Sequence, residues 1–400
     1  MSDQSVSAPA PAADPAGGRQ AGPAQAVVLL LASCLSVLGA VLLAPVLPRI
    51  QDAFAGTPGV ATLTPMVLTV PALVIGLTAS IAGRVVDRLG RKRLLVGALV
   101  VYAFVGTAPL WLSSLPLIVA SRVLVGLTEA AIMTCCTTLL ADYFHGAERD
   151  RYFGLQTVYT TVAATVFFAA GGLLGSWGWR TPFWLYAVSL PLAFAAARVI
   201  RQPSPARTRE KLPPLPWRTF RAPAAVTLAG GLVFYVLIVE LSYVLDGIGV
   251  TATATVGLVS AAGSLATAVA AYLFPRLAKP GPAATIPAAF VLCGLGILVL
   301  ALASSVPVVV LGAVVTGLGN GLLLPALLTR ALGGLTFAQR GRGTGVWTSA
   351  LFIGQFASPL IVLALAGATT GLSPALLVVG AAALLLALVV FGGSRLSGTR

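Results

Sequence analysis

The chain has 400 residues, of which 58% are hydrophobic and 9% are charged, and its formal net charge is +14 at pH 7. This composition excludes an ordinary soluble globular protein and indicates a membrane protein. The positive charge alone would suit a nucleic-acid-binding protein, but the positions of the basic residues explain it without a nucleic-acid partner.

Residues 1–25 consist mostly of Ala, Pro, Gly and Ser. Such a segment cannot bury a hydrophobic core, so we expect a disordered cytoplasmic tail. It carries too little positive charge, and the apolar run after it is too long, for a cleaved signal peptide. Residues 26–48 are therefore expected to form a retained first membrane span.

Further apolar runs follow, each about 20 residues long and nearly free of charge, which is enough for a helix to cross a hydrocarbon core of roughly 30 Å. These runs lack the alternating pattern of barrel strands. We therefore predict an all-α integral membrane protein with twelve transmembrane helices. After the first, the predicted spans are residues 60–82, 94–112, 116–141, 153–176, 181–200, 223–245, 250–274, 284–304, 306–332, 343–366 and 370–393.

The basic residues are distributed unequally between the two sides of the membrane. If both termini lie on one side, that side receives all but three of the 25 Lys and Arg residues. The exceptions are Arg49 and Arg180 on the opposite side and Arg122 inside a span. The positive-inside rule therefore predicts a multi-pass protein of the inner (plasma) membrane with both termini in the cytoplasm.

The chain contains an internal repeat with an offset of 191 residues. AERDRYFGL at 147–155 aligns with AQRGRGTGV at 338–346. In the same register GLTEAAIM at 126–133 aligns with GLGNGLLL at 317–324, which pairs Glu129 with Asn320. We predict two pseudo-symmetric six-helix bundles, residues 26–200 and 223–393, joined by a cytoplasmic linker at 201–222 and followed by a cytoplasmic tail at 394–400. Transporters built in this way hold their substrate between the halves.

Three segments resemble the major facilitator superfamily of transporters. GRVVDRLGRKR at 83–93 is similar to the family's signature loop, Gly-x-x-x-Asp-Arg-x-Gly-Arg-Lys-x. RVLVGLTEA at 122–130 resembles its fourth-helix Arg motif, and GWRTPFWLY at 178–186 resembles the Trp-Arg segment before its sixth span. The resemblance covers essentially the whole chain after the tail and implies a rocking two-bundle transporter.

The same resemblance implies that the loop at 83–93 is a latch at the cytoplasmic gate. Asp87 would face the positive N-terminal end of the eleventh span, near residue 343, and hold the halves together. Its basic neighbours would be partners for Asp87 and for acids such as Asp142. A loop that only fixes orientation and touches anionic head groups is the alternative. The gate residues are Gly83, Arg84, Asp87, Arg88, Gly90, Arg91 and Lys92.

A charge inside the hydrocarbon is costly, and the three ionisable residues that matter within the predicted spans are Arg122, Glu129 and Glu240. Arg122 and Glu129 are nearly two helical turns apart, so both project from one face, about 10 Å from each other, and we expect this face to line the cavity. Glu129 would then bind and release a proton as the cavity opens to each side in turn. The alternatives are a static Glu129–Arg122 pair that locks helix packing, and a Glu240 side chain that reaches the outer interface.

Polar and aromatic residues within the spans are candidates for the substrate cavity. A mainly apolar cavity with few polar groups would suit an amphipathic or lipophilic organic solute. These candidates are Gln156, Tyr159, Tyr235, Asn320, Trp347 and Gln355. The four cysteines all fall inside spans and the single histidine lies in a loop, which gives neither a disulfide framework nor a metal site, so we expect no metal and no cofactor.

Export is the predicted direction of transport. FFAAGG at 167–172 keeps both glycines of the efflux signature Gly-Pro-x-x-Gly-Gly but replaces its Gly-Pro, and the first three spans resemble the bacterial twelve-span drug:proton antiporters. We predict proton-coupled export of a small organic compound by a monomer whose partners are this solute, protons and the bilayer. The alternative is proton-coupled uptake or facilitated diffusion of a small polar nutrient such as a sugar or organic acid. An enzyme is not expected, because the sequence lacks a catalytic or metal-binding cluster.

Overall fold

The computed structural model describes residues 22–202 and 215–397 of the chain. Within these residues the regular secondary structure is helical, and twelve segments are long and apolar enough to cross a membrane. Each predicted span corresponds to one of these segments, so the predicted fold class is confirmed.

The helices divide into two sets of six membrane-crossing segments. The first set consists of α1 (Pro23–Val41), η1 (Ala44–Val46), α2 (Leu47–Ala53), α3 (Val60–Leu89), α4 (Arg91–Thr107), η2 (Ala108–Leu110), α5 (Leu115–Tyr143), α6 (Gly146–Gly175), η3 (Thr181–Val188) and α7 (Ser189–Val199). The second set consists of α8 (Trp217–Gly247), α9 (Thr253–Leu277), α10 (Pro282–Ala301), α11 (Val306–Gly333), α12 (Phe337–Ala368) and α13 (Leu372–Ser397).

Some helices extend beyond the predicted spans at their charged ends. Helix α8 begins at Trp217 instead of residue 223, and α13 continues to Ser397, into the predicted tail. Charged residues such as Arg218 end the apolar run but not the helix, because a helix can continue into the head-group region, where charges are solvated. The predicted linker is therefore shorter on its C-terminal side, and its residues 203–214 lie outside the described part, as do residues 1–21 of the predicted tail.

The first span is not one continuous helix. Helix α1 ends at Val41, and a short 3₁₀ turn leads into α2, which carries the chain to Ala53. Pro45 and Pro48 occur at this break, and proline cannot donate the backbone hydrogen bond that an uninterrupted α-helix requires. The distal third of this span is therefore a separate element that can contact both halves of the molecule.

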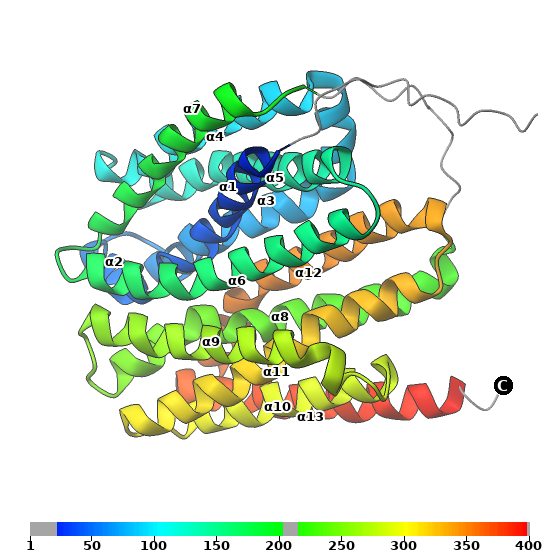
Figure 1. Ribbon diagram of the computed structural model, residues 1–400. Coiled ribbons are helices and arrows are strands. Elements are labelled where there is room, and N and C mark those ends of the chain that lie inside the picture. Colours follow the sequence, from blue (N-terminus) through cyan, green and yellow to red (C-terminus); the bar gives the residue numbers. More distant parts are fainter. Residues whose placement is uncertain (1–21, 203–214, 398–400) are drawn as a thin grey trace, which may run out of the picture.

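The two sets of helices form two bundles, with α1–α5 and α7 in the upper part of Figure 1, α8–α11 and α13 in the lower part, and α6 and α12 between them. One apolar core lies mainly among the first set and extends to Tyr235 and Val239 of α8, and a second lies among the last set. The first helix begins, and the last helix ends, at the same end of the molecule, which we call the terminal end. The opposite end, which carries α2, is called the distal end (Figure 1).

Equivalent glycines of the repeat make equivalent helix contacts in the two bundles. A Cβ atom at Gly126 of α5 would lie 2.8 Å from the Pro71 Cα of α3. A Cβ atom at Gly317 of α11 would overlap the carbonyl oxygen of Gly263 in α9. The fourth helix of each bundle therefore packs against the second at a position without a side chain, and the predicted pseudo-symmetry is confirmed.

Two helix pairs join the bundles to each other, α3 with α12 and α6 with α9. The hydroxyl groups of Thr165 in α6 and Ser264 in α9 lie 3.0 Å apart. Nearer the distal end, a Cβ atom at Gly172 would lie 2.7 Å from the Cα of Gly257, so α6 and α9 meet there backbone to backbone. The two glycines of the FFAAGG segment, Gly171 and Gly172, thus serve close packing against α1 and α9 respectively.

Candidate functional site

The carboxyl group of Glu129 is buried inside the N-terminal bundle, where α1, α4 and α5 meet. Glu129 is only 1% exposed. Glu129 Oε1 lies 3.0 Å from the hydroxyl oxygen of Tyr102 in α4, and the same hydroxyl lies 2.8 Å from the carbonyl oxygen of Leu35 in α1. The carboxyl group also lies directly against Gly39 of α1, where a Cβ atom would overlap it.

The Tyr102 hydroxyl has one proton and two neighbouring oxygens that can accept it. When Glu129 is ionised, the hydroxyl can donate to the carboxylate. When Glu129 is protonated, the carboxyl group can donate to the hydroxyl oxygen, which in turn donates to the Leu35 carbonyl. The arrangement therefore offers a hydrogen-bonded state for each protonation state of Glu129.

Arg122 lies on the same helix but in different surroundings. Its guanidinium donates to the carbonyl oxygens of Val105 and Gly106, 2.8 and 3.3 Å away, in the last turn of α4. It also lies 5.5 Å from the ring centres of Phe183 and Tyr186 in η3. Cations are stabilised by the free carbonyl groups at a helix C-terminus and by aromatic faces, so these contacts hold α4, α5 and η3 together.

The shared face of Arg122 and Glu129 is buried within the N-terminal bundle in this structure, and its exposure to the transport cavity stays a prediction. Arg122 is fully buried and its contacts all lie within the N-terminal bundle. The alternative of a static pair is not what the structure shows, because among the described residues Arg122 forms no ion pair with Glu129. Seven-residue spacing does place two side chains on one face, but it does not determine which neighbouring helix that face meets.

One contact connects the surroundings of Glu129 to the other bundle. Tyr235 of α8 is buried, and its hydroxyl donates to the carbonyl oxygen of Ala40 in α1 at 3.3 Å. Ala40 follows Gly39, the residue against which the Glu129 carboxyl group lies. Only one turn of α1 therefore separates the buried carboxyl group from the C-terminal bundle.

The C-terminal bundle contains the equivalent site with a neutral side chain. Asn320 of α11, the repeat partner of Glu129, donates to the Phe234 carbonyl of α8 at 3.2 Å. The thiol of Cys293 in α10 lies 3.4 Å from Asn320 Oδ1. Cys293 occurs 191 residues after Tyr102, so both members of the pair are repeated, but an amide cannot exchange a proton at physiological pH.

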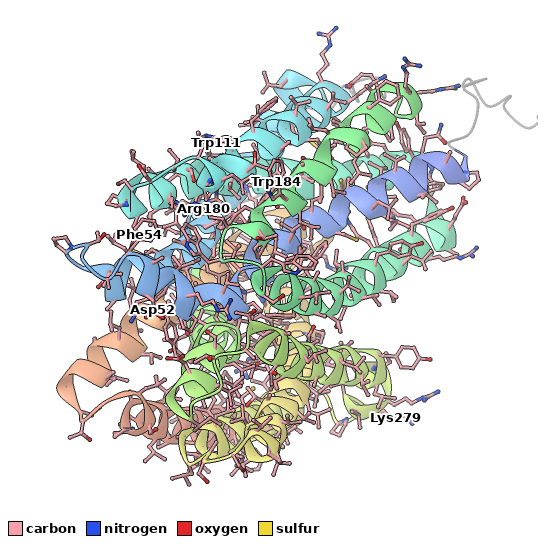
Figure 2. The ribbon with its side chains drawn as sticks, turned by 90° about the vertical axis from the view of Figure 1, so that its left-hand side faces the viewer. Asp52, Phe54, Trp111, Arg180, Trp184 and Lys279 are labelled. Carbon is pink, nitrogen blue, oxygen red and sulfur yellow. The ribbon has the colours of Figure 1, made fainter. Side chains whose placement is uncertain are left out.

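Glu240 of α8 is the third of the ionisable residues singled out from the sequence. It is 6% exposed and makes no hydrogen bond or ion pair within the described residues, so it does not reach the outer interface as a solvated side chain. Towards the distal end lies a pocket of about 250 Å³ between the bundles, lined in part by Arg49, Asp52 and Asp246. Figure 2, which looks onto the distal end, shows Asp52 near the boundary between the bundles.

Comparison with known proteins agrees with this architecture. The family profile described as Major Facilitator Superfamily matches residues 29–278. The chain belongs to this superfamily. It is therefore a multi-pass membrane transporter, and the two-bundle fold is the one that the superfamily shares with solved structures.

Two curated relatives are resistance proteins. The chain is 28% identical over 228 residues to the class C tetracycline resistance protein of Escherichia coli, a match that covers 56% of this chain and 55% of that protein. It is 29% identical over 364 residues to the chloramphenicol resistance protein of Streptomyces lividans, covering 86% of this chain and 89% of that protein. The chain thus spans only about half the length of the tetracycline protein but most of the chloramphenicol protein.

A solved structure supports the fold of this superfamily member. A bacterial homologue of the human lysosomal transporter Spinster, in an inward-facing and occupied conformation, has a TM-score of 0.78 and 14% sequence identity to it. The similarity covers 95% of this chain and 98% of that one.

The predicted gate loop of this transporter is described in part. Gly90 has a φ of +84° and joins α3 to α4, a conformation that favours glycine. Arg91 forms an ion pair with Asp142 of α5, so this predicted pairing is confirmed. The backbone N–H of Lys92 donates to Gln202 Oε1 at 3.0 Å. The side chains of Gly83, Arg84, Asp87 and Arg88 lie outside the described part of the structure, and the latch stays a prediction.

The six candidate cavity residues have different surroundings, and their role in a cavity stays a prediction. Gln156 donates to the hydroxyls of Ser33 and Thr137, 2.8 and 3.3 Å away, and so joins α6 to α1 and α5. Trp347 packs against a small cluster formed by Phe220 near the start of α8 and by Ala331 and Leu335 at and after the end of α11. Tyr159 is exposed and Gln355 is buried on α12.

Sequence reasoning missed Tyr102 and Gly39. A tyrosine or a glycine within an apolar span is common in helix packing, so neither residue was distinctive by itself. The signal that could have found Tyr102 is the repeat, because the offset that pairs Glu129 with Asn320 also pairs Tyr102 with Cys293.

Proposed function

We propose that this transporter exports a small lipophilic or amphipathic organic compound in exchange for protons, by alternating access. The observation that carries the proposal is the position of the Glu129 carboxyl group, buried between Tyr102 and Gly39 with a hydrogen-bonded arrangement for both of its protonation states. In this proposal the protein lies in the inner (plasma) membrane with its terminal end in the cytoplasm.

In the dry surroundings described above, the protonated form of Glu129 would be favoured over the ionised form. Burying a charge without a counterion costs several kcal/mol of desolvation free energy. Burying a neutral carboxyl group that donates a hydrogen bond to Tyr102 costs far less. Loss of the proton therefore favours a conformation that admits water to the carboxylate. One protonation state is thus linked to the closed N-terminal bundle and the other to its opening.

Helix α1 provides a direct route from this proton to the movement of the bundles. Gly39 lies against Glu129, and the next residue, Ala40, accepts a hydrogen bond from Tyr235 of the other bundle. A shift of α1 that makes room for a hydrated carboxylate would alter the contact with Tyr235. Arg49, nine residues further along the first span, donates to the Gly175 carbonyl at 2.9 Å and to the Thr251 carbonyl, which precedes α9 of the C-terminal bundle, at 3.3 Å.

Two further observations support export of an apolar compound. The relatives with printed functions include tetracycline and chloramphenicol resistance proteins. The described spans contain few ionisable side chains, whereas a sugar or an organic acid would need several charged or amide groups in the binding site. We further propose that the transporter functions as a monomer.

The proposal can be tested in proteoliposomes with an imposed pH gradient, using tetracycline and chloramphenicol as probes. Glu129→Gln should lose gradient-driven flux while it retains exchange of probe without a gradient, because glutamine fills the site but cannot carry a proton. Glu148→Gln, a change of an exposed carboxylate at the start of α6, is the matched control and should behave as the wild type. Gradient-driven flux that survives in Glu129→Gln, or probe that moves with protons instead of against them, would contradict the proposal.

A further inference from the structure

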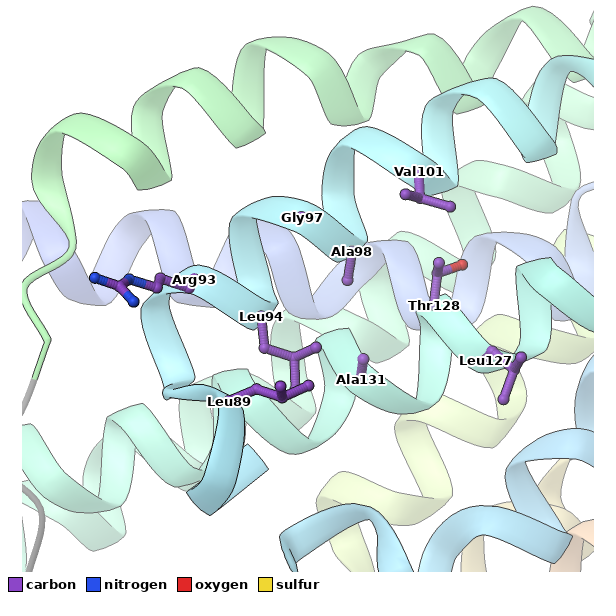
Figure 3. Close-up of a pocket in the computed structure, with 9 residues that line it drawn as sticks. All are labelled: Leu89, Arg93, Leu94, Gly97, Ala98, Val101, Leu127, Thr128 and Ala131. Carbon is purple, nitrogen blue, oxygen red and sulfur yellow. The ribbon is translucent and has the colours of Figure 1, made fainter. Parts of the chain in front are cut away.

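A groove of about 580 Å³ lies on the outside of the N-terminal bundle, near the terminal end. The end of α3, the first half of α4 and the middle of α5 form its walls (Figure 3). It does not belong to the surroundings of Glu129. Leu127, Thr128 and Ala131 of α5 face the groove, whereas Glu129 is buried on the other side of the same helix, against Tyr102 and Gly39.

The groove is apolar and faces the lipid. Leu89, Val101 and Leu127, which line it, are 56, 45 and 44% exposed. A Cβ atom at Gly97 would meet nothing within 4 Å, so the absence of a side chain there leaves the groove open. The Thr128 hydroxyl donates to the Leu124 and Val125 carbonyls of its own helix, so it does not offer its proton to a polar ligand.

Among the described residues that line the groove, Arg93 is the one cation, and it lies at the terminal end. Arg93 begins the wall formed by α4, and in Figure 3 its side chain extends past the end of the apolar section. Its neighbour Arg91 is engaged by Asp142, but the Arg93 side chain makes neither a hydrogen bond nor an ion pair within the described residues. An unpaired guanidinium is a good partner for a phosphate, to which it can donate two hydrogen bonds.

The length of the groove matches one leaflet of a bilayer. From Arg93 to Val101 the helix rises by about 12 Å, at roughly 1.5 Å per residue. This is slightly less than half of a hydrocarbon core of roughly 30 Å. A phospholipid whose phosphate contacts Arg93 would therefore have an acyl chain along Gly97 towards the bilayer centre.

We propose that this groove is a binding site for one anionic phospholipid of the leaflet at the terminal end. Its acyl chain lies between α4 and α5 over Gly97, and its phosphate binds Arg93. The site is independent of what the transporter carries and of the direction of transport. Charge complementarity selects an anionic lipid, because its net negative charge can pair with Arg93, whereas the phosphate of a zwitterionic head group is already balanced by the cation of the same lipid.

Native mass spectrometry of the purified full chain tests the site, with equal amounts of phosphatidylglycerol and phosphatidylcholine supplied in the micelles. The wild type should retain phosphatidylglycerol in preference by about fivefold, the ratio expected for one basic residue near an anionic head group. Arg93→Gln should remove the preference, and Gly97→Trp should remove most of the bound lipid of both kinds. Two matched controls should retain lipid as the wild type does. One is Arg276→Gln, at the terminal end of α9. The other is Gly392→Trp on α13, where a Cβ atom would also meet nothing within 4 Å.

Three results would overturn the proposal. Equal loss of preference in Arg93→Gln and Arg276→Gln would mean a diffuse attraction of the whole basic surface. Displacement of the bound phosphatidylglycerol by inorganic phosphate would mean an ion site without a role for the acyl chain. The Gly97→Trp variant could also retain all of its lipid and yet lose flux of tetracycline and chloramphenicol in phosphatidylcholine liposomes. This result would mean that the groove admits the transported solute instead. Thermal unfolding of each variant identifies any that fails to fold, and Arg93→Gln, at an exposed position, keeps the test decisive in that case.

Discussion

The hydroxyl of Tyr102 lies 3.0 Å from the carboxyl group of Glu129, and the same two positions in the second bundle are occupied by Cys293 and Asn320. The fold thus repeats the position of a polar pair but places an ionisable member in only one bundle. A proton exchanged at this site would therefore act on the N-terminal bundle alone, and the C-terminal bundle would respond through the contact between Tyr235 and Ala40.

Tyr102→Phe removes the hydrogen-bond partner of Glu129 without changing the shape of the site. We expect it to destabilise the protein by about 1–3 kcal/mol and to narrow the pH range of gradient-driven flux, because a buried polar group loses its partner. Flux measured from pH 5.5 to 8.5 in proteoliposomes, roughly the physiological titration window, is the readout. Tyr272→Phe, on an exposed tyrosine of α9, is the control, and an unchanged pH profile in Tyr102→Phe would rule out this role.

Gly39→Ala places a methyl group where the Glu129 carboxyl group lies. We expect this variant to lose transport, because either α1 or the carboxyl group must move. Glu129→Asp, which shortens the side chain, should restore part of the activity when combined with Gly39→Ala, and this non-additivity indicates direct contact. Gly367→Ala, at a position with open space, is the control. Strictly additive effects of the two changes would argue against the contact.

Asn320→Asp introduces a carboxyl group at the repeat position of Glu129. The Asn320 amide donates to the Phe234 carbonyl, and only a protonated aspartic acid can take over this bond. The folded state of the variant therefore binds its proton more tightly than the unfolded state, so its free energy of unfolding should fall as the pH rises from 5 to 8, by roughly 1–3 kcal/mol. Thermal unfolding at several pH values, compared with Asn320→Ala, measures the effect. A pH-independent loss would contradict this assignment.

Arg122→Lys preserves the charge but not the geometry of the guanidinium. A lysine cannot both donate to the Val105 and Gly106 carbonyls and stack on Phe183 and Tyr186, so we expect a loss of stability of about 1–3 kcal/mol. Flux per folded molecule should remain coupled to the pH gradient, because Arg122 has a packing role here. Uncoupled flux in a stably folded variant would instead assign Arg122 to proton transfer.

Arg49→Ala removes hydrogen bonds to both bundles at the distal end. We expect the distal pocket to open more often. The measurement is labelling of a cysteine introduced at Ser242, a buried residue of that pocket, by a membrane-impermeant thiol reagent added outside. The four native cysteines are buried, so background labelling should be low. Equal labelling rates with and without Arg49 would show that this residue does not hold the distal end closed.

The sequence was sufficient for the spans, their number and the repeat, because each depends on local hydropathy or on an exact offset. The offset of 191 residues pairs Glu129 with Asn320, and each of them forms a buried polar contact in its own bundle. The surroundings of Arg122 could not be predicted in this way. Helical spacing fixes the angle between two side chains on one helix, but the partner of each depends on how α4 and η3 pack, which no single span encodes. Tyr102 was missed for the same reason, since its importance depends on a neighbour in another helix.

The contact between Gly172 and Gly257 has a consequence for how the two bundles can move. Neither residue has a side chain, so there is nothing at this point to disengage and no rotamer to change when the helices tilt. The pair can act as a pivot, with the two halves rotating about it while the contacts on either side exchange. A bulkier residue at either position would push α6 and α9 apart and prevent the rotation about this contact.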